Sequence, residues 1–97
     1  MKTLNEKTQV FYDIDYIRIF TENIVTGIIR NPQKGQWVIN NRFVYKWVED
    51  LGQGHTATLY MDDTVVESYS VKGTVQNVYR VVFKAMTLAK YYTDLNN

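Results

Sequence analysis

Residues 74–93 constrain the fold most, because this segment contains neither glycine nor proline and its apolar side chains recur at helical spacing. On a helical wheel of about 100° per residue, the apolar side chains fill well over half of the circumference. The polar arc is narrow and holds Gln76, Arg80, Lys84, Thr87 and Tyr91. We therefore predict a helix over residues 74–93, with Thr74 as its N-cap.

This apolar arc is wider than a helix needs in order to lie on one sheet. A helix lying on a sheet needs an apolar stripe of roughly 100° or a little more. A strongly curled sheet of the same chain, a second copy of the protein or another partner would cover the excess, and a two-fold dimer is the commonest assembly. The residues expected to mediate self-association or partner binding are Tyr79, Phe83, Met86 and Tyr92, with Arg80, Lys84 and Tyr91 facing outward.

Upstream of this helix, the pattern predicts strands. Apolar and polar residues alternate over residues 10–16, with a change of phase near Tyr16, which is typical of a strand with one solvated face. Residues 24–30 are rich in β-branched side chains and form a second strand candidate. Residues 31–35 contain both proline and glycine and are the clearest loop in the chain.

Two further regions read as hairpins. Residues 36–51 fit a hairpin turning at Asn40-Asn41, although apolar spacing after Asn41 also fits a helix; their β-branched and aromatic content favours strands. Residues 55–61 and 64–71 flank Asp62-Asp63, which suits a tight turn. The predicted fold class is therefore α+β: one domain over residues 1–97, a single antiparallel sheet of four to five strands, and the C-terminal helix packed on it. Residues 1–8 are expected to form a flexible N-terminal arm.

No catalytic pattern emerges from the sequence. The chain has no cysteine and one histidine, His55, without a nucleophile pattern around it. The carboxylate pairs fit a solvated strand face and two turns better than a reaction centre; they are Asp13 and Asp15, Glu49 and Asp50, and Asp62 and Asp63. We predict no enzyme, no cofactor, no metal site and no small-molecule substrate.

The charge distribution suggests a second kind of partner. The chain carries a net charge of +1, yet no acid occurs between Glu22 and Glu49 or between Glu67 and Asp94. Basic and aromatic side chains in these stretches could contact phosphates and stack on bases. The residues concerned are Arg30, Lys34, Trp37, Arg42, Tyr45, Lys46 and Lys72. Strand alternation weakens this idea, because it would place Arg42 and Lys46 on the face opposite the rings.

The sequence therefore predicts a small non-catalytic interaction or regulatory module that acts by protein–protein binding, such as a phage-type accessory or inhibitor protein. A nucleic-acid-binding domain with a basic, aromatic sheet surface is the alternative. We expect a homodimer in the cytoplasm and no membrane contact, because cysteine and an export signal are missing and the apolar runs are too short to span a bilayer.

Overall fold

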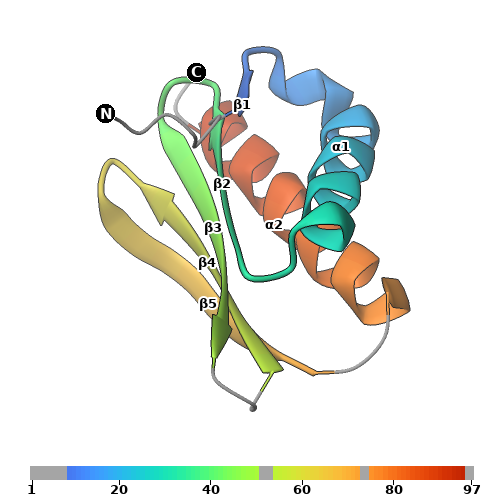
Figure 1. Ribbon diagram of the computed structural model, residues 1–97. Coiled ribbons are helices and arrows are strands. Elements are labelled where there is room, and N and C mark those ends of the chain that lie inside the picture. Colours follow the sequence, from blue (N-terminus) through green and yellow to red (C-terminus); the bar gives the residue numbers. More distant parts are fainter. Residues whose placement is uncertain (1–8, 51–53, 73–74, 96–97) are drawn as a thin grey trace, which may run out of the picture.

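The computed structural model describes residues 9–50, 54–72 and 75–95. These residues form a five-stranded sheet with two helices packed on one of its faces (Figure 1). In chain order, the elements are β1 (Gln9–Phe11), the 3-10 helix η1 (Ile14–Tyr16), α1 (Ile17–Arg30), β2 (Lys34–Ile39), β3 (Phe43–Asp50), β4 (Gly54–Met61), β5 (Thr64–Val71) and α2 (Val75–Leu95). The predicted α+β class, the sheet and the C-terminal helix are confirmed. The predicted arm over residues 1–8 and the N-cap Thr74 lie outside the described residues.

The strands lie side by side in chain order, and each neighbouring pair is antiparallel except β1 and β2, which are parallel. The parallel pair was not predicted and exists because α1 carries the chain back between these two strands. Both hairpins turn where predicted. Asn40 and Asn41 each have φ of 55°, and Asp62 and Asp63 have φ of 52° and 69°. Two successive left-handed residues make the tight turn that Asn and Asp tolerate, so residues 36–51 are a hairpin and not a helix.

The predicted strands over residues 10–16 and 24–30 are wrong. The first ends at Phe11, whose ring stacks on Phe20 at 4.4 Å, and residues 24–30 belong to α1. The reason is that Phe20, Ile24 and Ile28 recur every four residues and are all buried, so burial along one helical face outweighs β-branched content. The helix ends before Pro32, and the Asn31 N–H still donates to the Gly27 carbonyl at 3.0 Å.

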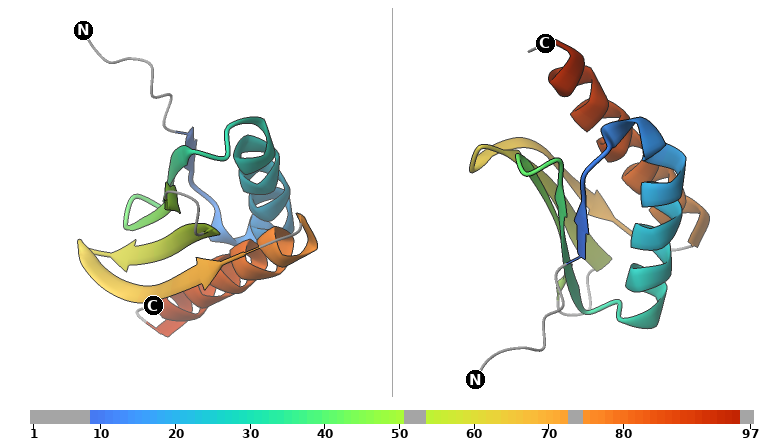
Figure 2. Two further views of the ribbon diagram at one scale, coloured as in Figure 1. Left: turned by 60° about the horizontal axis from the view of Figure 1, so that its bottom comes forward. Right: turned by 90° about the horizontal axis from the view of Figure 1, so that it is seen from above.

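The sheet has one covered face and one open face, because both helices lie on the same side of it (Figure 2). On the covered face, Phe43, Tyr45 and Trp47 of β3 are fully buried. The intervening residues Val44, Lys46 and Val48 point to the open face and are half-buried or exposed. Strand β3 thus follows the alternation that its sequence predicts.

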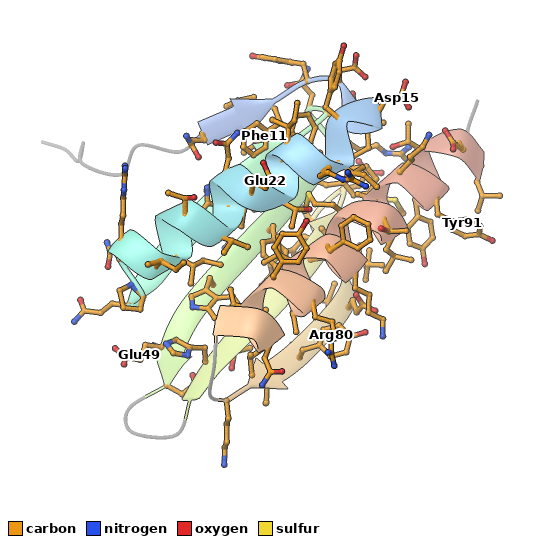
Figure 3. The ribbon with its side chains drawn as sticks, turned by 90° about the vertical axis from the view of Figure 1, so that its right-hand side faces the viewer. Phe11, Asp15, Glu22, Glu49, Arg80 and Tyr91 are labelled. Atoms are coloured by element: carbon orange, nitrogen blue, oxygen red, sulfur yellow. The ribbon has the colours of Figure 1, made fainter. Side chains whose placement is uncertain are left out.

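Helix α2 shares its apolar arc between the sheet and α1, which runs antiparallel beside it (Figures 1 and 3). Val82, Ala85, Met86 and Ala89 are buried in the core. Val78, Val81, Leu88 and Tyr92 are half-buried against it. A helix that the sequence did not predict therefore covers part of the excess apolar surface, which the sequence pattern assigned to a curled sheet, a second copy or a partner.

Candidate functional site

Two surfaces of the described chain bring together residues that the sequence singled out. The first is the aromatic pair, Tyr79 and Phe83, whose rings stack on α2 with centroids 6.2 Å apart and planes 10° apart. Each side chain is 37% exposed, although large apolar residues of this helix are otherwise mostly packed inward. The aromatic pair is therefore an ordered apolar surface rather than a part of the core.

The aromatic pair lies on the flank of α2 that faces α1. Tyr79, Phe83 and Lys90 recur at i, i+4 and i+11, which places them on one flank. Lys90 Nζ donates to Asp15 Oδ1 at 3.0 Å, just before α1 begins, and to Asp94 Oδ2 at 3.2 Å. These hydrogen bonds, first to Asp15 and then to Asp94, raise the pKa of Lys90. The helices are thus tied together at one end of the flank that carries the rings.

The other residues predicted for self-association lie in different environments. Met86 is fully buried, so its predicted role as a contact residue is wrong: it fills the core. Tyr92 packs half-buried against the same core. Arg80, Lys84 and Tyr91 are exposed, and Lys84 Nζ lies 5.1 Å from the centroid of the Tyr69 ring.

The second surface is the basic hollow, a cavity of about 1080 Å³ between α1 and the edge of β2. Its cations are Arg30 from the end of α1, Lys34 from the start of β2 and Lys46 from β3, and no Asp or Glu is among the described residues that line it. The hollow lies beside the first residues of β2, at the end of the sheet where Gln9 of β1 pairs with Trp37. The structure thus brings three of the predicted basic residues to one place.

Trp37 lines the hollow but is only 5% exposed, so it cannot stack on a ligand. Its Nε1–H donates to Gln9 Oε1 at 3.1 Å. A Cβ on Gly35 would lie 2.4 Å from Trp37 Cη2, and one on Gly27 would lie 3.0 Å from Cζ2. The two glycines therefore let the indole lie flat against the backbone, which explains why this ring is covered.

The remaining residues of the predicted nucleic-acid surface are elsewhere. Tyr45 is buried on the covered face, so its predicted stacking role is wrong for the same reason as that of Trp37. Arg42 pairs with Asp62 at the hairpin end of the sheet. Its Nε and Nη2 atoms each lie 3.0 Å from Asp62 Oδ2. Lys72 follows β5 and lines a small cleft with Arg80 instead of the basic hollow.

Buried polar atoms are a feature that the sequence did not reveal. Among the described residues, hydrogen-bond partners are lacking for Tyr45 Oη, Trp47 Nε1, His55 Nε2 and Glu67 Oε1. The other Glu67 oxygen accepts from the Tyr69 hydroxyl. Burial, and then the charge of Glu67, raise the pKa of Tyr45. His55 lies against Trp47 with ring centroids 5.2 Å apart, so it is a packing residue.

The described part of the chain holds no group of three or more His, Asp or Glu side chains that could bind a metal ion. Within the same residues, no helix is long and apolar enough to cross a membrane. Comparisons with protein-family models, with curated proteins and with solved structures gave no match. The aromatic pair and the basic hollow are therefore the candidate sites, and both suit binding.

Proposed function

We propose that this protein is a non-catalytic binding module that acts by protein–protein contact, and that the contact surface is centred on the aromatic pair. The observation that carries this proposal is the stacked, part-exposed arrangement of Tyr79 and Phe83. Large aromatic side chains that are ordered before binding lose little conformational entropy and dominate interface energies. Ile19 and Ile29 of α1 are more than half exposed and extend the apolar character of the helical layer.

A second copy of this chain is the proposed partner. A two-fold axis that runs between α1 and α2, along their length, sets α1 of each copy against α2 of the other. Glu22 on α1 and Arg80 on α2 lie on opposite sides of this line (Figure 3). The same operation therefore brings opposite charges together at two symmetric positions, outside the apolar centre. The absence of cysteine supports a reducing compartment, the cytoplasm, as the place where this protein acts.

Light scattering of the purified protein tests this proposal. We expect the wild type to have twice the 11.4 kDa mass of one chain, and the double variant Tyr79→Asp with Phe83→Asp to have the mass of one chain. Both side chains are on the surface, so the fold should survive the charges. Val65→Asp is the control, because Val65 is also an exposed apolar residue and lies on β5, away from the helices.

The control variant should keep the dimeric mass. A wild type that is already monomeric would contradict the proposal, as would a double variant that keeps its mass with an unchanged circular dichroism spectrum. A charge at Met86 would instead destabilise the core, because this side chain is fully buried.

A further inference from the structure

We propose that the basic hollow binds single-stranded nucleic acid, with its cations on the phosphates and the strand continuing onto the open face of the sheet. This site is separate from the aromatic pair, because α1 lies between them: Asn23, Thr26 and Gly27 line the hollow, whereas the aromatic pair lies on α2. The two proposals can therefore fail independently.

Charge is the first argument. Arg30, Lys34 and Lys46 come from three different elements and converge on one cavity that is lined by no acid among the described residues. The nearest acids in β3 are Glu49 and Asp50, beyond Val48, and Asp50 Oδ2 accepts a hydrogen bond from Thr56 Oγ1 at 2.6 Å. A phosphate in the hollow thus meets positive charge from α1 and from the sheet. The net charge of the whole chain, which is only +1, does not reveal this local excess.

The uncharged lining also suits a nucleotide chain. Amide side chains both donate and accept hydrogen bonds, as base edges and sugar hydroxyls require. Those in the hollow are Gln9, Asn23, Asn31, Gln33 and Gln36. A cavity that offered only cations would hold a phosphate but would leave the polar edges of bases without partners.

Shape favours an extended strand over a small anion. The volume of about 1080 Å³ is at the upper limit of small-molecule sites. Lining residues come from both faces of β2: Gly35 and Trp37 point to the covered face, and Lys34 and Gln36 to the open face. The hollow therefore wraps around the sheet edge, and a ligand that fills it passes from the helix to the open face.

Tyr60 provides the ring that the buried Trp37 and Tyr45 cannot provide. It lies on the open face of β4, two residues after Thr58, which is the cross-strand partner of Lys46. Lys46 Nζ is 5.1 Å from the centroid of the Tyr60 ring. A base stacked on Tyr60 would take the place of this ammonium group, which would then be available to a phosphate. Stacking on one aromatic ring is worth about 1–3 kcal/mol per base.

Fluorescence anisotropy with a labelled oligonucleotide of about 12 nucleotides tests the proposal. Phosphate contacts of Arg30 and Lys46 predict a slope of about −1.4 in log K against log salt, or about sevenfold weaker binding at 200 mM than at 50 mM salt. The double variant Arg30→Gln with Lys46→Gln should remove this slope and weaken binding about 60-fold at 50 mM salt. Tyr60→Leu should weaken binding about tenfold and leave the slope unchanged.

The matched control is Arg18→Gln with Lys84→Gln, two exposed cations outside the hollow. Both double variants change the net charge from +1 to −1, that is, 1 minus 2, so they alter long-range attraction equally. We expect the control to bind within about twofold of wild type. Absence of binding at 50 mM salt, or an equal loss in the control, would overturn the proposal.

Two competitors identify the ligand class. Poly-glutamate of matched length that competes as well as unlabelled oligonucleotide would assign the hollow to acidic proteins and overturn the proposal. A mononucleotide or inorganic phosphate that competes equally well would assign it to a small anion, with the same consequence. Competition by the oligonucleotide alone supports it.

Discussion

The covered and open faces of the sheet are built from the same strands, and they differ in what each position requires. In β3, Trp47 lies fully buried under the helices, while its neighbour Val48 is 44% exposed. Rings and cations that are adjacent along residues 42–48 are therefore separated in space, because successive side chains of a strand point to opposite faces. A cluster in sequence becomes a cluster in space only among alternate residues.

The largest expected effect comes from replacing one buried ring of the covered face. Trp47→Ala should lower the free energy of unfolding by about 3–5 kcal/mol, because the side chain is fully buried and leaves a cavity. Val48→Ala, one residue away, should change it by less than about 0.5 kcal/mol. Urea unfolding followed by far-ultraviolet circular dichroism measures both variants, since it does not depend on tryptophan fluorescence. Equal losses in the two variants would mean that the open face is also covered, for example by a partner.

A smaller effect of opposite sign is expected at Tyr45. Its hydroxyl is buried without a hydrogen-bond partner among the described residues, so Tyr45→Phe should raise the free energy of unfolding by about 1 kcal/mol. Tyr60→Phe, on the open face, is the matched control and should change it by less than about 0.5 kcal/mol. A loss of stability in Tyr45→Phe would show that the hydroxyl does have a partner.

The same position predicts a dependence on pH. Burial, and then Glu67, raise the pKa of Tyr45 in the folded state, whereas an unfolded tyrosine ionises near pH 10. Stability from the neutral hydroxyl is therefore present below about pH 10 and is lost as the pH rises further. Between pH 8 and pH 11, the wild type should lose about 1.4 kcal/mol more than Tyr45→Phe in urea unfolding. Parallel losses in both proteins would contradict this assignment.

The alternation of buried and exposed side chains also decided which elements could be predicted from the sequence. Strands β2 to β5 could be predicted because each has one buried face and a turn of Asn or Asp residues with positive φ. Helix α1 was missed because Ile24, Val25 and Ile28 are β-branched, and only their spacing with Phe20 indicated a helix. The error had a consequence: without α1, the excess of the apolar arc of α2 could be assigned only to a strongly curled sheet, a second copy or a partner.

The candidate sites were predictable only in part. Tyr79 and Phe83 could be assigned to the surface of α2 from its wheel, but Met86 could not be excluded without the position of α1. Arg30, Lys34 and Lys46 were identified as basic residues, yet their convergence depends on the packing of α1 against β2. Tyr60 was missed because its role follows from cross-strand register, which sequence spacing does not specify.

The smallest effect is expected for Lys46→Met, which keeps an unbranched side chain and removes the ammonium group over Tyr60. A cation–π contact on an exposed surface is worth about 0.5–1 kcal/mol, so the free energy of unfolding should fall by no more than this. Urea unfolding in the absence of nucleic acid measures the loss. A loss above about 2 kcal/mol would make Lys46 a structural residue. The open face of the sheet would then contribute to folding as the covered face does. A small loss would instead leave Lys46 available for the ligand, because a side chain that contributes little to folding can change partners without unfolding the sheet.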